Sequence, residues 1–270
     1  MAQKSTSSLP VLKVPRVCVS APHALQQNGD VTRFEVRPDD YAYNGNCSQL
    51  KCDTVKASYY AFEFKPTEFT YLENEFFSIA DWHLNSEVGK QNIEKGWGHR
   101  SPVAINLWKD QISVLLRPMN NGELKRVLNV PFKKDWNKVE IWITWSSDPK
   151  KGKFKCVING QKVELDKIPT LYQDNKATYF KCGIYRSGKY PGNSVMEFRN
   201  IVQSDQKLMP DFDSAPLGEG KGYKKNGIDK GLQPEMLEER NQQRQAEIDE
   251  RKKAKGKPTS SEKTEESKEK

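Results

Sequence analysis

Apolar and polar positions alternate with a period of two along many short segments of this chain. Such alternation predicts β-strands, because successive side chains of a strand point to opposite faces of the sheet. The clearest case is residues 179–186, in which Phe180, Cys182 and Ile184 fall on one face. The other face of this segment is mostly polar, so the pattern predicts a strand with one buried and one accessible side.

The rest of the chain repeats the pattern in short runs separated by turn residues. Residues 41–54 read as a loop around Asn44-Gly45-Asn46, and Pro66 is expected to end the strand that begins at residue 57. Asn159-Gly160 favours a type I′ hairpin turn. Many short strands with almost no helical periodicity predict an all-β sandwich, jelly roll or barrel. The further strands are expected at residues 16–20, 32–37, 57–64, 75–82, 103–108, 111–116, 125–130, 138–146, 153–158, 161–165 and 194–202.

Composition divides the chain into segments of different character. The hydrophobic share of 35% is low for a uniformly globular chain. We expect a flexible lead-in over residues 1–15, a β domain over residues 16–202 and a Gly/Pro linker over residues 203–234. Residues 235–270 form a charged, low-complexity tail that we expect to be partly helical or disordered.

Charge is unevenly distributed along the chain. The tail holds ten Lys/Arg and ten Asp/Glu, so the whole net charge of +8 belongs to residues 1–234. A basic folded domain suggests a polyanionic partner, such as a polysaccharide, a nucleic acid or an acidic surface. Nucleic acid is the least favoured of these, because no nucleic-acid-binding motif is present. The polar tail suggests a tether to another protein, with no motif to support it.

The five cysteines form no CxxC pair, and no histidine lies at zinc-finger spacing, so we predict no metal site. Their odd number leaves the disulfide state open. No segment approaches the ~18 apolar residues of a membrane span, so no membrane partner is expected. The first residues lack the apolar core of a signal peptide, and the sequence does not predict a compartment.

The polar face of residues 179–186 holds the first candidate site. Lys181 and Tyr185 share this face, and Gly183 leaves a gap between them. At ~3.3 Å per residue, the two side chains lie about 13 Å apart along the strand. An acidic chain laid across the strand could contact both, although an ordinary strand with two solvated polar residues fits the pattern as well.

The octapeptide Tyr-Phe-Lys-Cys-Gly-Ile-Tyr-Arg at residues 179–186 resembles the signature strand of the jelly-roll polysaccharide lyases. These include alginate lyases, glucuronan lyases and the heparin lyase I group. An early strand at residues 33–37, a strand that ends in Trp82-His83, a hairpin at residues 153–160 and a closing strand follow the order of features in that family. The resemblance covers about residues 30–202 and implies a concanavalin-like jelly-roll fold.

Enzymes of this family cleave uronic-acid polysaccharides by β-elimination, which requires a group that stabilises the enolate charge and groups that transfer protons. The resemblance implies that Tyr185 acts as base and acid. It implies that His83 is a second base or a charge-stabilising residue, and that Lys181 binds a substrate carboxylate or sulfate. Further substrate contacts are expected from Arg186 and His99. No cofactor is implied.

Two positions depart from the family pattern. Asp81 stands where alginate lyases have a glutamine that neutralises the substrate carboxylate, and Cys47 stands where an Arg-Ser-Glu-Leu-Arg-like strand has its first arginine. An Asp81 carboxylate would repel a uronate unless it were protonated or bridged by a divalent cation such as calcium. Arg33 or Lys51 is expected to supply the missing cation.

Two classes of function therefore follow from the sequence. The first is a lyase that cleaves an acidic, uronic-acid-containing polysaccharide by β-elimination. The second is a catalytically inactive module of the same fold that binds acidic glycans. The departures at positions 47 and 81 bear on activity and leave the fold prediction unchanged.

Overall fold

The computed structural model describes residues 16–18, 21–42, 45–51, 58–84, 101–118, 125–172 and 178–205. The chain divides into two compact units, Met1–Tyr223 and Lys224–Lys270, and every described residue belongs to the first. The expected lead-in and charged tail lie outside the described residues. No helix in the described part of the chain is long and apolar enough to cross a membrane.

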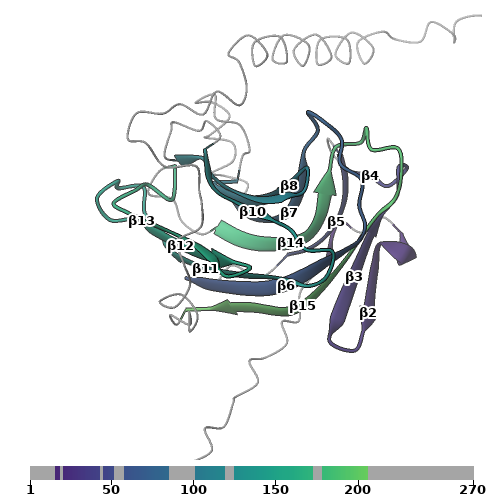
Figure 1. Cartoon of the computed structure of the whole chain (residues 1–270), viewed down its shortest axis with the longest axis horizontal. Coiled ribbons are helices and arrows are strands. Elements are labelled where there is room, and N and C mark those ends of the chain that lie inside the picture. The colour runs from purple at the N-terminus through teal and green to yellow at the C-terminus, as the bar shows by residue number, and fades with distance from the viewer. Residues whose placement is uncertain are drawn as a thin grey trace, which may run out of the picture. The chain divides into compact units, whose positions relative to one another are not determined.

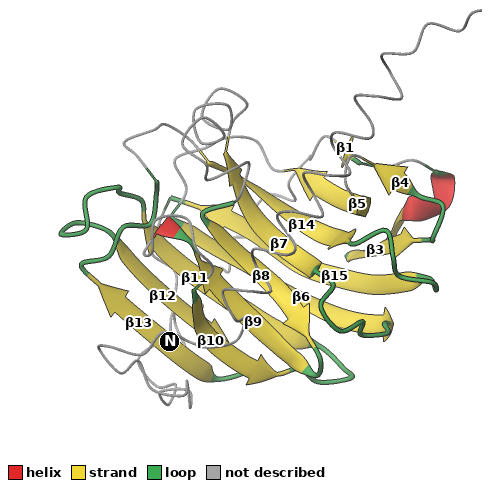
Figure 2. Cartoon of the chain, turned by 90° about the horizontal axis from the view of Figure 1, so that it is seen from above, coloured by secondary structure: helices red, strands yellow, loops and turns green. Residues whose placement is uncertain are grey.

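The described residues form two antiparallel sheets stacked as a sandwich (Figure 1). Strands account for most of them, and the 3-10 turn η1 (Pro22–Ala24) lies beside β4 (Figure 2). Sheet A has the strand order β1 (Arg16–Val17), β5 (Gly45–Lys51), β14 (Thr178–Arg186), β7 (Phe77–Leu84), β8 (Val103–Trp108), β9 (Gln111–Leu116) and β10 (Arg126–Pro131), with β4 (Tyr41–Ala42) paired to β5. Sheet B has the order β13 (Gln161–Asp166), β12 (Lys153–Ile158), β11 (Asn137–Thr144), β6 (Tyr59–Glu68), β15 (Ser194–Ser204), β3 (Val31–Val36) and β2 (Leu25–Asn28). The all-β sandwich predicted from the sequence is confirmed.

The apolar faces of the two sheets form one core. Trp82 of β7 is fully buried and packs against Tyr60 of β6 and Phe180 of β14, with ring centroids 5.1 Å and 5.0 Å apart. Tilted and edge-on contacts of this kind add about 0.5–1.5 kcal/mol per pair to the burial of apolar area. Phe180, Cys182 and Ile184 all belong to the core, as their alternation predicts. The polar face of β14 therefore points away from sheet B.

Two local predictions of secondary structure are wrong. Residues 41–54 were expected to form a loop around a turn at residues 44–46, but Tyr41 and Ala42 of β4 pair with Asn46 and Gly45 of β5, and β5 is the neighbour of β14. Its sequence, Cys47-Ser48-Gln49-Leu50-Lys51, is poor in strand-forming residues. Pro66 was expected to end a strand, but it lies within β6. On one side, β11 pairs with β6 only up to Phe64, and on the other side β15 pairs with Pro66 next to a register shift. A proline is tolerated at such a bulge because a ladder hydrogen bond is already missing there.

The predicted hairpin at Asn159-Gly160 is confirmed. Both residues have positive φ angles, 51° and 83°, as a type I′ turn requires, and they join β12 to β13.

Candidate functional site

The face of sheet A that points away from the core gathers the polar residues predicted for the site. On β14 this face presents Tyr179, Lys181, Gly183 and Tyr185, because the residues between them are in the core. We call this surface the outer face of sheet A. By the same alternation it includes Cys47, Gln49 and Lys51 of β5, Ser78, Asp81 and His83 of β7, Ala104, Asn106 and Trp108 of β8, and Ser113 of β9.

Lys181 and Asp81 are direct cross-strand partners, and Gln49 joins their charged groups. The Lys181 ammonium donates to Gln49 Oε1 at 3.3 Å, and Gln49 Nε2 donates to Asp81 Oδ2 at 3.4 Å. Gln49 is buried, with 1% of its surface exposed. Burial lowers the pKa of Lys181, but the charge of Asp81, with smaller contributions from Tyr179, Cys18 and Cys47, outweighs burial and raises that pKa above its usual value. Lys181 is therefore charged at neutral pH, and its charge is balanced within the sheet.

The Asp81 carboxylate is held on its other side by a serine. Ser101 Oγ donates to Asp81 Oδ1 at 3.1 Å, and the Ser101 carbonyl accepts a hydrogen bond from Arg117 at 2.6 Å. Asp81 is buried, with 5% exposure, so it faces Ser101, Gln49 and the charge of Lys181 rather than solvent. Within the sheet, the two hydrogen bonds and the nearby charge of Lys181 compensate the charge of Asp81.

His83 lies at one end of the outer face of sheet A. Its ring stacks on Tyr179, with centroids 5.4 Å apart and planes 23° from parallel, and Tyr179 is its cross-strand partner. The Lys51 ammonium lies 4.1 Å from the centre of the same Tyr179 ring. This arrangement forms a cationic and aromatic corner in which a cation–π contact orients Lys51.

Tyr185 lies in a different cross-strand row from His83. In the register of sheet A, Tyr185 is opposite Cys47 on one side and Ser78 on the other, and Ser78 is opposite Asn106 of β8. His83 is opposite Tyr179, six residues before Tyr185 on β14. The structure thus brings Lys181 and Asp81 together and separates the two predicted proton-transfer residues along the strand.

Asn106 is a polar residue of the outer face that the sequence reasoning missed. It is half-buried, and its Oδ1 atom is buried without a hydrogen-bond partner among the described residues. Two strand spacings separate Asn106 from Tyr185, which places their Cα atoms about 10 Å apart. The alternation of residues 103–108 could have shown its orientation, because Val103, Ile105 and Leu107 are the core positions. Gln49 was missed because residues 41–54 were read as a loop.

Gly183 is required where β14 crosses between Lys181 and Tyr185. Its φ of +126° is a conformation that residues with a side chain rarely adopt. A Cβ atom at this position would lie 2.4 Å from the Ser48 carbonyl oxygen and 2.8 Å from Gln49 Cα. The pairing of β14 with β7 also shifts register between Cys182 and Tyr185. The glycine and the bulge therefore set how β5, β14 and β7 present Gln49, Lys181 and Tyr185.

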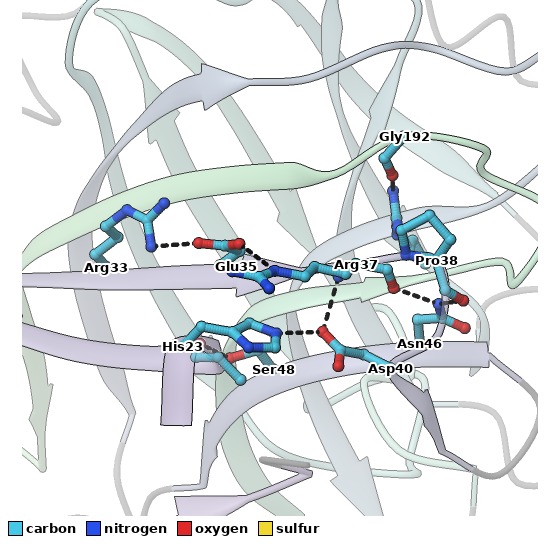
Figure 3. Close-up of polar contacts among 11 residues, drawn as sticks. His23, Arg33, Glu35, Arg37, Pro38, Asp40, Asn46, Ser48 and Gly192 are labelled. Carbon is cyan, nitrogen blue, oxygen red and sulfur yellow. Dashed lines mark hydrogen bonds and ion pairs between the residues drawn. The ribbon is translucent and has the colours of Figure 1, made fainter. Parts of the chain in front are cut away.

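Two arginines predicted to contact substrate do not reach this face. Arg33 lies on β3 of sheet B, where it forms an ion pair of 2.7 Å with Glu35, which also binds Arg37 (Figure 3). Arg186 is fully buried and donates to the Gly192 carbonyl at 2.6 Å and to Ser194 Oγ at 2.8 Å. Arg33 was misplaced because sequence cannot tell which sheet takes a strand. Arg186 has the parity of the core positions, so its burial could have been predicted from the alternation along β14. Lys51 is the alternative cation that does lie on the outer face.

His99 lies outside the described residues. Among the residues that the structure describes, no group of three or more His, Cys, Asp or Glu side chains could hold a metal ion.

Comparison with known proteins agrees with this fold. The polysaccharide lyase family model matches residues 19–201, more than half of the chain. This chain belongs to the polysaccharide lyase family. No curated protein matches the sequence.

Solved structures similar to the chain include lyases of two kinds. The endo-β-1,4-glucuronan lyase of the fungus Trichoderma reesei is 16% identical, with a TM-score of 0.50 over 72% of this chain and 87% of the other. An alginate lyase of Pseudomonas aeruginosa is 15% identical, with a TM-score of 0.47 over 70% of this chain and 88% of the other. The likeness to the glucuronan lyase shows that this member of the family has the predicted jelly-roll fold.

Proposed function

We propose that this member of the polysaccharide lyase family cleaves an acidic, uronic-acid-containing polysaccharide by β-elimination on the outer face of sheet A. The observation that carries the proposal is the cross-strand row in which Tyr185, a candidate proton-transfer group, lies two strands from the amide of Asn106. Membership of the family and the net positive charge of residues 1–234 support an acidic polysaccharide as the substrate.

Tyr185 transfers the protons in the proposed reaction. The proton on C5 of a uronate is α to the carboxylate, and its removal places charge on the carboxylate oxygens. The Tyr185 oxygen takes this proton, the C5 electrons form the C4–C5 double bond, and the bond from C4 to the glycosidic oxygen breaks. The same tyrosine then returns a proton to the departing oxygen. Each such proton transfer contributes about 10²–10⁴-fold to rate.

Asn106 takes the position of the charge-stabilising group. Its side chain lies on the same row as Tyr185, and its oxygen has no partner among the described residues. An amide whose N–H donates to the uronate carboxylate stabilises the charge that develops there. Gln49 is less suited to this role because it already bridges Lys181 and Asp81. The substitution of aspartate for the expected glutamine at position 81 is thus compatible with activity.

Lys181, Lys51 and His83 bind the neighbouring sugar residues in this proposal. Lys181 lies between the row of Tyr185 and the corner formed by His83, Tyr179 and Lys51. A carboxylate or sulfate on an adjacent residue would meet the two ammonium groups there, and the stacked rings offer an apolar surface to a sugar face. His83 acts in binding rather than as the second base, because the register separates it from Tyr185.

One residue that both removes and returns the proton has a consequence for the substrate. The C5 proton and the C4 oxygen must then lie on the same side of the sugar ring. This holds for D-glucuronate and D-mannuronate, whereas L-guluronate presents the two groups on opposite sides. We therefore expect glucuronan and mannuronate-rich alginate to be cleaved, and guluronate-rich alginate to be a poor substrate.

The direct test is to incubate the full chain with glucuronan, with mannuronate-rich and guluronate-rich alginate and with heparin, and to follow the ultraviolet absorbance of the unsaturated product. Tyr185→Phe should reduce kcat at least ~100-fold. Tyr190→Phe is the matched control, because Tyr190 belongs to the core cluster. An unimpaired Tyr185→Phe enzyme would rule out the assigned role.

The runner-up function is an inactive module that binds acidic glycans. Among the described residues, the row of Tyr185 holds no arginine, and Cys47 stands at one position of that row. This lack of an arginine favours the inactive module. No absorbance change on any polymer, together with retention on a column of immobilised uronate polymer that salt reverses, would establish this alternative and reject the lyase.

A further inference from the structure

Two cysteines meet at the margin of the outer face of sheet A. Cys18 follows β1, the edge strand that pairs with β5, and its thiol is hydrogen-bonded to that of Cys47 on β5. Both cysteines are free thiols. Cys18 is half-buried and Cys47 is buried, so Cys18 is the one that solutes can reach. The remaining described cysteines, Cys156 and Cys182, are fully buried in the core.

The surroundings make Cys18 the nucleophile of the pair. The hydrogen bond from Cys47 lowers the pKa of Cys18 to about 7, against burial, and the charge of Lys181 lowers it further while that of Asp81 opposes it. The same hydrogen bond raises the pKa of Cys47, and burial raises it further. Near neutral pH a substantial fraction of Cys18 is therefore thiolate, and Cys47 is its thiol donor. A thiolate next to a second thiol is the arrangement found at oxidation-sensitive sites.

We propose that Cys18 and Cys47 form an oxidisable thiol pair that a hydroperoxide converts to a disulfide. The Cys18 thiolate attacks the terminal peroxide oxygen, the O–O bond breaks, and Cys18 becomes a sulfenic acid while hydroxide, or the alkoxide of an organic hydroperoxide, leaves. The Cys47 sulfur then attacks the Cys18 sulfur, and the sulfenic hydroxyl leaves as water with the Cys47 proton. The two sulfurs together lose two electrons, which reduce the peroxide.

The fold permits this closure with little rearrangement. The sulfur atoms are already in hydrogen-bond contact, and a disulfide needs them at ~2.05 Å. Cys18 adjoins a two-residue edge strand that pairs with sheet A on one side only, so it can move toward β5. Cys47 is the cross-strand neighbour of Tyr185, so the bond would form beside the proposed catalytic row. The inference does not require that the protein be a lyase.

The first test is alkylation by limiting iodoacetamide at pH 7, with the rate at each cysteine followed by peptide mass spectrometry. Cys18 should react faster than Cys156 and Cys182. In Cys47→Ala the hydrogen bond is lost, and the rate at Cys18 should fall about threefold. The variant has a smaller thiolate fraction at Cys18 than the parent protein, and the higher nucleophilicity of its thiolate offsets this only in part. In Cys47→Ser a hydroxyl keeps the hydrogen bond, and the rate should be close to that of the parent protein. Equal rates at Cys18 in the parent and Cys47→Ala would overturn the proposed activation.

The second test is treatment of the full chain with hydrogen peroxide, followed by trypsin without reduction. Cleavage after Lys51 separates Cys47 from Cys52, which lies outside the described residues, so their disulfides can be told apart. A peptide pair linking Cys18 to Cys47, lost on reduction and absent from Cys47→Ser, is the expected result. A link from Cys52 to either cysteine, or oxidation of Cys18 to sulfinic acid with no link, would overturn the proposal. The lyase assay is not part of either test, so failure here leaves the proposed function untouched.

Discussion

Lys181 and Asp81 are cross-strand partners whose charges are joined through a third strand, because the Gln49 amide accepts from one and donates to the other. The carboxylate that the sequence places against an acidic substrate is thus engaged inside the sheet. Together with Tyr179, Cys18 and Cys47, its charge outweighs burial and raises the pKa of Lys181, so that this partly buried cation is retained at neutral pH. The three groups form a nearly neutral platform between the row of Tyr185 and the corner of His83.

Replacement of Gln49 by leucine tests this bridge. Gln49→Leu keeps the size of the side chain but leaves polar groups of Lys181 and Asp81 without a partner, which should lower the free energy of unfolding by about 1–3 kcal/mol. Urea unfolding followed by fluorescence measures the loss. Gln26→Leu, at an exposed position of β2, is the control and should change stability by less than ~0.5 kcal/mol. Equal stability of Gln49→Leu and the parent protein would show that the bridge has no structural role.

The sequence predicted the fold because the signals for it are local. Alternation identified the core positions of β14, and Asn159-Gly160 identified a hairpin by the backbone angles that those two residues tolerate. The order of features then gave the family, which the match over residues 19–201 confirms. These signals require no knowledge of which strands are neighbours in space.

The site could not be derived to the same extent, because it depends on contacts between distant strands. Gln49 and Lys181 are 132 residues apart, and the strand that carries Gln49 has weak strand propensity. Arg33 has a suitable pattern for a strand, but its pairing partners place it in the other sheet. The alternation along β14 places Arg186 at a core position, so its burial could have been predicted. The resemblance to the family was given more weight than this alternation.

Gly183 offers a test of how strictly the backbone of β14 is constrained. Gly183→Ala forces a side chain into a positive φ, which alone costs about 1–3 kcal/mol, and its Cβ would overlap Ser48 and Gln49 of β5. We expect a large fall in the thermal unfolding temperature, or failure to fold. Gly192→Ala is the matched control, because no atom lies within 4 Å of the added Cβ and the φ is ordinary. A Gly183→Ala protein as stable as Gly192→Ala would contradict the local geometry described here.

Glu35 should contribute stability that depends on pH. Burial would raise its pKa, but hydrogen bonds from Arg37 and Arg33, each of 2.7 Å, outweigh burial and hold that pKa below its usual value (Figure 3). A carboxyl with a lowered folded-state pKa contributes fully above the unfolded pKa of ~4.3, and the contribution is lost as pH falls through the folded value.

Glu35→Gln should therefore lower the free energy of unfolding by about 1.5–3 kcal/mol at neutral pH. The difference from the parent protein should shrink below about pH 4, because the parent loses the same contribution on protonation. Urea unfolding at a series of pH values gives both quantities. Glu164→Gln removes a more exposed partner of Lys155 and should cost less than ~1 kcal/mol. A difference for Glu35→Gln that did not vary with pH would contradict this assignment.

Asn106 provides the sharpest test of the proposed site, because two substitutions of similar structural effect should differ in kinetics. Asn106→Ala removes the amide, and the loss of one charge-stabilising donor should lower kcat about 10²–10³-fold. Asn106→Asp keeps the shape but places a carboxylate against the substrate carboxylate, so KM should rise as well. The increase in KM should be smaller at high salt, because salt screens the repulsion between the two carboxylates. If Asn106 had only a structural role, both variants would have a lower unfolding temperature, and their folded forms would have the same kinetics. The measurement therefore pairs steady-state kinetics at two salt concentrations with thermal unfolding. Equal KM values for the two variants would show that no substrate carboxylate meets Asn106 and would move the charge-stabilising role to another residue of the outer face.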